Sequence, residues 1–571
     1  MAASSNHWGY PEPGPQSPSV DVGVGSHFFA DNEKWNGIIE SGQFDDIVCG
    51  SGHCALAYID TALRRDPKRK ILVLERGPYW IPEHFQNLPL AFGSVVGGPS
   101  ETFPWHLSSK TYNSSVRFLH GSCPYFGGRS TMWSAWSPQP TSDLMRGFPK
   151  SMLDTAAKPT FWSNCKDLLH VTQADELIVP VYKNLQKLID TSLAAGVKQI
   201  TGADTTEPAS LAVGHKTSLS TLTFEKFSTV GPLLEIYNKQ SDLASQGTGS
   251  PLTIATNVVV HKFDVDPEDV NKRAYVLHTS CGSLDLPNGD SNIILALGTV
   301  PNTTLLLNSI PDDMKGRAGS RITGHFVSHI TARFPVPSGT QLSDHLEIGA
   351  NYIAGKDATT NLQYHIQVSA FHSPNPATDA GDALRFCPDY AAAPSPEQLE
   401  GSENYIVLVC ATLGELEENN PNSLITPLDD PDLTTNIRLQ ILPSDNDLKL
   451  QTLMDQATYD AVKVMAGSQP IQYWNSALAK PGWQTAQPPA SAIHPPGIVH
   501  EASTLHMSDD LSGDAKAAVG PDYKPKGCGN VYVTGGALFP SAGSWNPTLT
   551  MCGYAQDLAA KLVTVKNGGK A

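Results

Sequence analysis

Residues 44–55 of the chain read FDDIVCGSGHCA, an apolar run that meets two glycines separated by one residue. A helical pattern follows as far as Arg65, a second apolar run covers Ile71–Leu74, and Glu75 comes next. This order of strand, glycine turn, helix, strand and acid is typical of a βαβ unit that binds a dinucleotide. Two glycines alone would mean little, but here the flanking runs, the spacing and the acid are all present.

Each part of this segment has a physical role in the prediction. Gly50 permits the tight turn after the strand, and Gly52 lets the backbone approach a pyrophosphate at the N-terminus of the helix. Ala55 is small enough for the helix to pack closely on the strand. Glu75, 20 residues after Ala55, can accept hydrogen bonds from ribose hydroxyls. We therefore predict an adenine dinucleotide site at this turn.

Two later segments favour an enclosed FAD over an NAD that exchanges at every turnover. Residues 120–133 read HGSCPYFGGRSTMW, a second glycine-rich loop, and residues 292–303 are an apolar run that ends in small residues. Ala296 and Gly298 in the second segment can pass close to the same ADP moiety. Cofactor segments spread along the whole chain suit a cofactor that stays bound. An NAD-dependent dehydrogenase is the alternative.

Three apolar runs that each meet a glycine lie far apart in the sequence, at Phe44–Cys49, Ile293–Leu297 and Val531–Thr534. Short continuous apolar runs are typical of buried parallel strands. We predict an α/β fold in which a Rossmann-like FAD-binding domain is interleaved with an α+β substrate domain built on an antiparallel sheet. The predicted divisions are an N-terminal arm (1–40), the FAD-binding domain (41–140, 250–330 and 495–571) and the substrate-binding domain (141–249 and 331–494).

The chain between Leu342 and Leu450 alternates apolar and polar residues, for example over Leu362–Val368 and Asn436–Leu442. Such alternation predicts a half-exposed antiparallel sheet, which we expect to be the lid or floor of the substrate pocket. Apolar residues at three- and four-residue spacing predict helices over Ala174–Ala194 and Leu448–Met465.

Composition limits the partners and the location of the protein. The 571 residues include 39 Lys and Arg against 56 Asp and Glu, so the formal net charge is −17. With no basic run longer than Lys68–Lys70, neither nucleic acid nor an anionic membrane is an expected partner. No apolar stretch approaches the roughly 20 residues that cross a bilayer. Residues 1–7 show neither a basic nor an apolar region, so we expect no secretory signal. Nine cysteines without a CxxC pair indicate reduced thiols and a cytoplasmic protein.

The C-terminal region carries the most specific pattern. Residues 530–540 read NVYVTGGALFP, residues 543–550 read GSWNPTLT, and a helical pattern follows. Together with the segments above, these blocks resemble the glucose-methanol-choline (GMC) oxidoreductases, and within them the pyranose-oxidase-like branch, which also has two glycines where Gly535 and Gly536 stand. The resemblance covers residues 44–133, 251–329 and 497–562 well, and the stretches between them loosely.

The resemblance implies a catalytic pair. Asn546 opens the NPTLT run and takes the position of the second member. For the first member there are three candidates, His494, His500 and His506. Residues 500–507 read HEASTLHM and match the family's histidine block when His500 leads it. A neutral His500 can remove the hydroxyl proton of an alcohol while the Asn546 amide donates to the same oxygen.

The resemblance also implies the contacts of FAD. Its ADP half would lie at Gly50, Gly52 and Glu75, with Val260 at the adenine. The residues implied around the flavin are Gly128, Ser130 and Met132 in the loop over the ring, and Gly536, Ala537, Asn546, Pro547 and Thr548 beside the last helix. Pyranose oxidases bind FAD covalently through a histidine in a Ser-Thr-His-Trp run. Because Met132 occupies that position here, we expect FAD to be non-covalent, and we expect no metal site.

The branch implies a small-molecule alcohol as the substrate, namely a secondary hydroxyl of a sugar or glycoside, and O2 or a quinone-type compound as the electron acceptor. Other hypotheses stay open at this point. The substrate could be an aryl or secondary-metabolite alcohol, the enzyme could be a GMC-type lyase without net redox turnover, or the chain could be a binding protein on the same scaffold.

Overall fold

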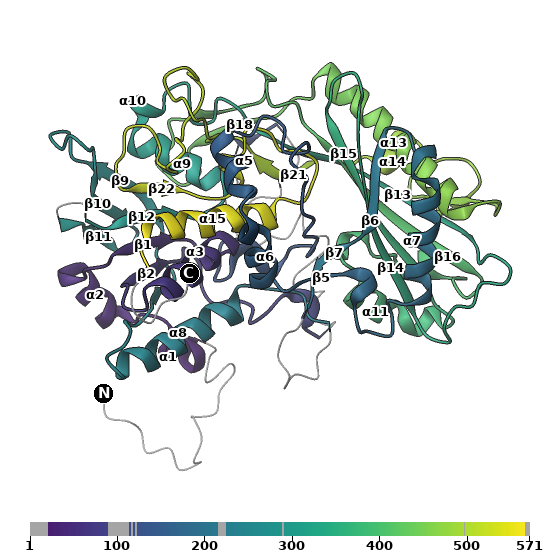
Figure 1. Ribbon diagram of the computed structural model, residues 1–571, viewed down its shortest axis with the longest axis horizontal. Helices are drawn as coiled ribbons and strands as arrows, with labels where there is room; N and C mark the ends of the chain where they lie inside the picture. Colours follow the sequence, from purple (N-terminus) through teal and green to yellow (C-terminus); the bar gives the residue numbers. More distant parts are fainter. Residues whose placement is uncertain are drawn as a thin grey trace, which may run out of the picture.

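The computed structural model describes residues 21–89, 113–115, 118–119, 123–214, 224–287, 290–495 and 497–565. A parallel sheet and a large antiparallel sheet lie beside each other (Figure 1). Residues 1–20 of the predicted N-terminal arm lie outside the described residues. The rest of the arm includes α2 (Asn32–Ser41), whose buried Trp35 donates from Nε1 to the carbonyl of Cys281 at 2.9 Å.

The parallel sheet has five strands in the order β22, β12, β1, β2 and β8. Their bounds are Val531–Val533, Asn292–Leu295, Asp46–Cys49, Ile71–Leu74 and Thr253–Ala255. The three apolar runs that we predicted to share a sheet are its adjacent strands β1, β12 and β22, so this prediction is confirmed. Side chains of β1 and β2 are buried on both faces, as continuous apolar runs require.

Helices cover this sheet and begin at its carboxyl edge. α3 (His53–Arg65) follows β1, α9 (Thr299–Ser309) follows β12, and α15 (Thr548–Leu562) packs along α3 (Figure 1). Two further helices, α6 (Pro159–Leu168) and α8 (Val230–Ser245), pack against α15 and α3 respectively. Both lie in segment 141–249, which we predicted for the substrate domain. We propose that they be counted with the parallel-sheet layer.

The antiparallel sheet has the strand order β20, β19, β13, β16, β15, β14 and β6, and β21 pairs with β13 beside this row. In that order the strands are Gly482–Gln484, Gln472–Asn475, Thr323–Pro335, Tyr405–Glu415, Gln363–His372, Glu347–Lys356 and Ala203–Pro208, with β21 at Gly497–Ala502 and pairing also with β4 at Phe118–Leu119. A parallel-sheet layer combined with an antiparallel sheet confirms the predicted fold class.

The prediction that this sheet is half exposed is wrong for its central strands. β15 is buried along its whole length, and β14 and β16 are nearly so. Alternate residues of β16 explain this, because Leu408 packs in a cluster with α13 (Asp445–Ala466) and α7 (Asn184–Gly196), whereas its neighbour Val409 packs in the main core. Helices therefore cover one face, and the parallel-sheet layer covers the other.

The two predicted helices differ in outcome. α13 (Asp445–Ala466) contains the whole span predicted at Leu448–Met465, and Ser444 caps it by accepting from the backbone N–H of Asp447. The helix predicted over Ala174–Ala194 is too long, because a short 3₁₀ turn and a loop containing Pro180 precede α7. Proline lacks the backbone N–H that a continuous helix needs at that point.

The run Asn436–Leu442 also differs from its prediction. It forms β18 (Ile437–Gln440), which pairs with β17 (Leu424–Pro427) and β3 (Asn113–Ser114) in a small separate sheet.

The remaining elements are η1 (Asp21–Gly25), α1 (Ser26–Phe28), η2 (Phe85–Asn87), η5 (Gly128–Thr131), α5 (Lys150–Ala156), β5 (Val171–Gln173), η6 (Ala174–Glu176), η7 (Val197–Gln199), β7 (Ser210–Ala212), β9 (Val260–Val265), β10 (Ala274–Thr279), β11 (Gly282–Asp285), α10 (Pro311–Met314), α11 (Pro376–Phe386), η9 (Tyr390–Ala392), α12 (Pro396–Leu399), α14 (Ala490–Ile493) and η10 (Gly536–Leu538).

All nine cysteines carry free thiols, and eight of them are buried. Cys49 lies on β1, Cys54 on α3 and Cys552 on α15, so these three are part of the packed scaffold. Among the described residues, no helix is both long enough and apolar enough to cross a membrane.

The turn after β1 gives the first testable prediction. Gly50 has φ +103°, and a Cβ there would lie 2.5 Å from the carbonyl oxygen of Ala296 on the neighbouring strand. We expect Gly50→Ala to lower the free energy of unfolding by about 2 kcal/mol or more, since both the backbone and the close approach oppose a side chain. Chemical denaturation followed by circular dichroism measures this change.

Gly52→Ala is the matched control. Gly52 has φ −79°, and a Cβ there would meet no atom within 4 Å. With no ligand bound to any of the proteins compared, this variant should stay within about 1 kcal/mol of the wild type. Equal stability of the two variants would contradict the account of Gly50.

Candidate active site

One large cavity opens at the carboxyl ends of the parallel strands. Gly50, Leu74, Ala296 and Thr534, at the ends of β1, β2, β12 and β22, all line it. The cavity contains about 1650 Å³ of space not filled by atoms, its open mouth included. Ligands of open α/β sheets bind outside the carboxyl ends of the strands, so this cavity is the candidate site.

Most of the residues predicted from the sequence meet at this cavity. Those that line it are Gly50, Gly52, Glu75, Gly128, Val260, Ala296, Gly298, Gly536, Asn546, Pro547, Thr548 and His500. Residues far apart in the chain, from β1 to α15, therefore share one lining.

Four predicted residues do not line the cavity. Ala55 is fully buried within α3, in line with its expected role in helix packing, and Ala537 is buried in η10. The Ser130 hydroxyl is turned to the protein, where it donates to the carbonyl of Gly127 at 2.6 Å. Met132 packs in an apolar cluster with Ile81, Phe85, Cys123 and Tyr125.

Three helices begin at the cavity without a side-chain cap. Their N-cap residues are Gly52 for α3, Gly298 for α9 and Pro547 for α15, and none accepts a backbone N–H through a side chain. The first N–H groups of a helix have no partner within the helix, and the helix dipole is positive at this end. Three such ends around one cavity favour a ligand with several anionic or electron-rich groups.

Glu75 is held in place at the end of β2. Its Oε2 accepts from the hydroxyl of Ser51 at 2.6 Å, and its Oε1 accepts from the backbone N–H of Gly77 at 3.1 Å. Burial raises the pKa of Glu75 to about 7. The Ser51 hydroxyl also accepts from the N–H of Gly127 at 2.9 Å, so it joins the two glycine-rich loops. The prediction overlooked Ser51, although it lies between the two glycines of the first loop.

His500 lies in an irregular part of β21. This strand pairs with β13 through Thr323 and His325, and the register shifts between them. A Cβ at Gly324 would lie 2.8 Å from the carbonyl oxygen of Val499, so only glycine permits the strands to approach here. His500 itself has φ +58°, which is uncommon outside glycine and is typical of a bulge that redirects a side chain.

The ring of His500 contacts a second histidine. Its Nδ1 lies 2.9 Å from Nδ1 of His325 on β13, and the two rings meet edge to face. Burial lowers the pKa of His500 well below its usual value, and His325 and Arg129 add to the effect. Burial also lowers the pKa of His325, to about 4. Both rings are therefore neutral at pH 7.

Asn546 is fixed through the oxygen of its amide. Its Oδ1 accepts from Nε2 of Gln367 at 2.7 Å and from the hydroxyl of Tyr352 at 3.1 Å. Tyr352 and Gln367 are directly opposite each other on β14 and β15, so the two donors lie side by side on one face of the sheet. Because Oδ1 has two donors, Nδ2 is the part of the amide left to donate to a ligand.

The other two candidate histidines lie elsewhere. His494 pairs through Nε2 with Asp455 at 2.8 Å, and His506 pairs through Nε2 with Asp514 at 3.1 Å. Neither lines the cavity. Among the described residues, no group of three or more His, Cys, Asp and Glu side chains is arranged to hold a metal ion.

The sequence prediction missed the polar face of the antiparallel sheet. Tyr352, His365 and Gln367 are buried behind Asn546, and the rings of Tyr352 and His365 stack at 4.5 Å. His365 and Gln367 are the polar members of the alternating run Leu362–Val368, which we predicted as part of a half-exposed sheet at the lid or floor of the substrate pocket. The signal was present in the sequence, but an active-site wall and a solvent face produce the same alternation.

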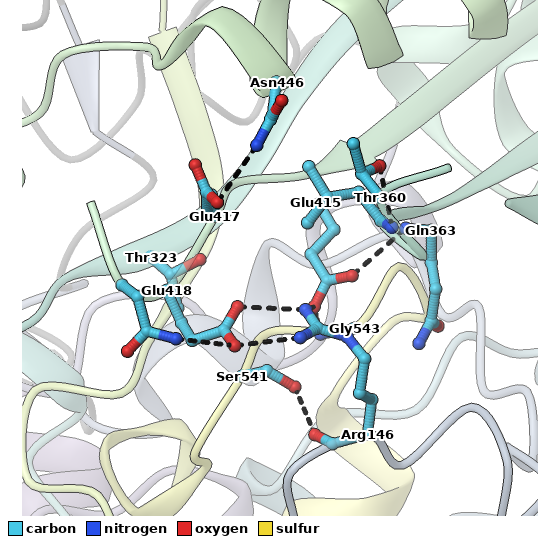
Figure 2. Close-up of polar contacts among 12 residues, drawn as sticks. Arg146, Thr323, Thr360, Gln363, Glu415, Glu417, Glu418, Asn446, Ser541 and Gly543 are labelled. Atoms are coloured by element: carbon cyan, nitrogen blue, oxygen red, sulfur yellow. Dashed lines mark hydrogen bonds and ion pairs between the residues drawn. The ribbon is translucent and has the colours of Figure 1, made fainter. Parts of the chain in front are cut away.

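An ion pair between the half-buried Arg146 and the buried Glu415 holds the loop that leads to Asn546 (Figure 2). Glu415 at the end of β16 accepts from Nη2 of Arg146 at 2.9 Å, from the backbone N–H of Gln363 at 3.1 Å and from the N–H of Gly543 at 3.2 Å. Arg146 also binds Glu418, and its carbonyl accepts from the hydroxyl of Ser541 at 2.7 Å. The loop over residues 541–546 is thus tied to the antiparallel sheet.

Comparison with known proteins agrees with this arrangement. Residues 423–555, which include His500 and Asn546, match the family model described as GMC oxidoreductase. The solved structure of pyridoxine 4-oxidase from Mesorbium loti is similar in fold, with a TM-score of 0.52 and 13% sequence identity over 91% of this chain and 99% of that chain. No curated protein sequence matches the chain.

The predicted resemblance to the GMC oxidoreductases is therefore confirmed. Residues 423–555 match the family model, the rest of the chain shares the fold, and together these findings support an oxidoreductase acting on CH–OH groups; the pyranose-oxidase-like branch is not tested by them. Members of this family are generally flavoproteins that bind FAD.

The buried carboxyl group of Glu415 gives a prediction on stability. Burial raises its pKa from 4.5 to about 7, so the folded protein binds this proton more tightly than the unfolded chain does. The stability that this proton contributes is complete below pH 4.5 and is lost as the pH rises to about 7. Between pH 5 and pH 8 the wild type should lose roughly 2–3 kcal/mol more than Glu415→Gln. Chemical denaturation at both pH values measures the difference.

Glu418→Gln is the control for this experiment. This substitution removes the more exposed of the two carboxylates that pair with Arg146, and it leaves Glu415 buried. We expect it to keep the wild-type direction of the pH dependence. A Glu415→Gln variant with an unchanged pH dependence would overturn the role given to this carboxyl group.

Proposed function

We propose that the protein is an FAD-dependent oxidoreductase that oxidises an alcohol, with a secondary hydroxyl of a sugar or glycoside as the substrate group. The single observation that carries the proposal is one cavity that joins the glycine turn after β1 to His500 and Asn546. A cofactor in this cavity would place its dinucleotide end at the glycine turn and its reactive end beside His500 and Asn546.

The residues of the cavity fit FAD. A Cβ on Gly52 would meet no protein atom within 4 Å and would extend into the cavity instead, so the absence of a side chain leaves room for a ligand at the first helix. The uncapped N-termini of α3, α9 and α15 suit a pyrophosphate and an electron-rich ring. We propose that Gly50, Gly52, Glu75, Val260, Ala296 and Gly298 hold the ADP half.

The remaining lining would hold the flavin half. The residues that we propose for it are Gly128, Gly536, Pro547 and Thr548, with Ser130, Met132 and Ala537 supporting them from the buried side. When bound, FAD supplies the acceptor for the hydride that leaves the substrate carbon.

His500 is proposed as the base. Since its Nδ1 faces His325, Nε2 is the nitrogen that takes the hydroxyl proton of the substrate. The lowered pKa keeps His500 neutral at pH 7, which is the form that accepts a proton. Asn546 would donate from Nδ2 to the same oxygen and stabilise its developing negative charge, because Gln367 and Tyr352 hold the amide oxygen on the other side.

The substrate class and the electron acceptor belong to the proposal too. The pyranose-oxidase-like branch, which the Gly535–Gly536 pair supports, favours a sugar or glycoside. The similarly folded protein is by name an oxidase of pyridoxine, so aryl alcohols enter the substrate screen. O2 and a quinone-type compound are the two acceptors to be compared.

Reduction of the flavin by substrate tests the catalytic pair. In anaerobic stopped-flow mixing with monosaccharides, glycosides and aryl alcohols including pyridoxine, the substrate should bleach the flavin band. His500→Ala should slow this bleaching about 10²–10⁴-fold, and Asn546→Leu about 10²–10³-fold. The wild-type rate should be constant near pH 7–8 and fall only in acid well below pH 6.5, where His500 becomes protonated.

His494→Gln serves as the control, because His494 lies outside the cavity. It should reduce its flavin at close to the wild-type rate. A His500→Ala variant whose flavin is reduced at the wild-type rate would contradict the assignment of His500 as the base. Turnover of an alcohol without bleaching would instead indicate the non-redox lyase.

The mode of FAD binding gives a separate prediction. Met132 has no ring nitrogen that could form the covalent link of the pyranose oxidases, and its side chain packs among apolar residues. Acid precipitation of the yellow purified protein should therefore release the flavin into the supernatant. Colour retained on the pellet would refute non-covalent binding, and a colourless protein with bound NAD would refute the choice of cofactor.

A further inference from the structure

We propose that the loop of residues 428–436 forms the wall of the cavity over the adenosine end of the cofactor, and that Asn308 fastens this loop to α9. The inference rests on the proposed function in one respect, namely that the cavity holds a dinucleotide with its ADP half at Val260. The loop connects β17 to β18 and lies in segment 331–494, which we predicted for the substrate domain. None of the cofactor residues predicted from the sequence lies in it.

The loop reaches the cavity through two residues. Leu433 and Thr434 line the cavity, as do Thr304 and Leu305 of α9. Both loop residues are half-buried. The hydroxyl of Thr434 donates to Oδ1 of Asp432 at 2.7 Å, so Leu433 is the apolar side chain that the loop brings to this wall. Pockets for flat organic ligands are mostly lined by apolar groups with a few fixed polar ones, and this wall has that character.

The end of α9 places the loop near the proposed adenine position. The hydroxyl of Ser309 accepts from the backbone N–H of Phe263 at 3.0 Å, and Phe263 lies on β9, the strand that begins at Val260. Asn308, which precedes Ser309 on the helix, holds the loop. The loop, the end of α9 and β9 therefore meet on one side of the cavity.

The other end of α9 lies beside the catalytic segment. Thr299 at its first position donates from Oγ1 to the carbonyl of Glu501 at 2.8 Å, and Glu501 follows His500 directly. Asn308 is in the last turn of this 11-residue helix, which is about 16 Å long. The loop is therefore fastened far from His500, so it is suited to contact the adenosine end of a dinucleotide and not the reacting atoms.

Asn308 makes three hydrogen bonds to the loop. Its Nδ2 donates to the carbonyl of Leu433 at 2.7 Å and to Oδ1 of Asn436 at 3.2 Å, and its Oδ1 accepts from Nδ2 of Asn436 at 2.8 Å. A backbone carbonyl can only accept, so the contact with Leu433 sets the orientation of the Asn308 amide. One side chain thus holds the loop both at the cavity and at its last residue.

The loop also holds its own shape. The backbone N–H of Leu428 donates to the carbonyl of Asn436 at 2.7 Å and closes the base of the loop. Asp432 accepts from the backbone N–H of Thr434 at 3.0 Å and from the hydroxyl of Thr435 at 3.1 Å. A wall that is ordered before binding contacts its ligand with little further loss of entropy. We therefore expect the loop to strengthen the binding of the adenosine end.

Binding of FAD, ADP and FMN by the full-length protein, freed of its flavin, tests this role. FAD and ADP share the adenosine end, whereas FMN carries the flavin without it. We expect Asn308→Leu and Leu433→Ser each to raise the Kd of FAD and of ADP about 10-fold, since each removes contacts at this wall. The Kd of FMN should stay within about 2-fold of the wild-type value. Isothermal titration calorimetry measures all three.

Gln440→Leu is the matched control. Gln440 lies on β18 and donates from Nε2 to the carbonyl of Asn422 at 3.0 Å, and neither residue lines the cavity. This variant therefore also loses a hydrogen bond from a side chain to the backbone in the same small sheet. It should bind FAD and ADP as the wild type does. If Asn308→Leu does not fold, as judged by circular dichroism, Leu433→Ser decides.

The three ligands keep this inference apart from the proposed function. Weaker binding of ADP in the loop variants would support the loop even if no alcohol reduced the flavin, or if the cofactor were NAD, because both dinucleotides contain ADP. Unchanged binding of FAD and ADP in the loop variants would overturn the role of the loop and leave the alcohol oxidation standing. An equal loss of FMN binding would overturn it too, since a contact with adenosine cannot weaken a ligand that lacks adenosine.

Discussion

Polar side chains buried where the two sheets meet are the constraint on which the rest of the site depends. A buried polar group without a partner costs roughly 1–3 kcal/mol, and several of these groups have a partner across the boundary. His325 contacts His500, Gln367 donates to Asn546, and Glu415 accepts from Gly543. In each contact a long antiparallel strand holds a residue of the C-terminal segment. The contacts that orient the site therefore also fasten the two layers to each other.

The sequence allowed prediction of the features that depend on neighbours along the chain. The turn at Gly50, the helix after it and the acid at Glu75 follow from local spacing, and the structure has β1, α3 and β2 where the pattern indicated. His500 and Asn546 came from a resemblance over short blocks, and both line the cavity. The directions of the Ser130 and Met132 side chains could not be predicted in this way, because motif spacing indicates the path of a loop but not where each side chain points.

The features of the site that were not predicted from the sequence depend on pairing between distant strands. Tyr352 and Gln367 become neighbours only through the register of β14 and β15. Alternation along Leu362–Val368 correctly indicated a strand with one polar face, yet it does not say what covers that face. A polar residue on a solvent-exposed face and one on a buried catalytic wall have the same period, and only the partner across the boundary distinguishes them. The helix predicted from Ala174 failed for a local reason, the proline at 180.

This dependence on register is compatible with a fold that is kept while most of the sequence differs. The chain matches the GMC family model over residues 423–555 alone, while its fold follows that of a 13% identical oxidase over 91% of its length. In this chain Gln367 and Tyr352 on the antiparallel strands donate to Asn546, and His325 contacts His500. Under the proposed function, a substitution on these strands would change the position of the catalytic pair as well as the wall of the substrate pocket.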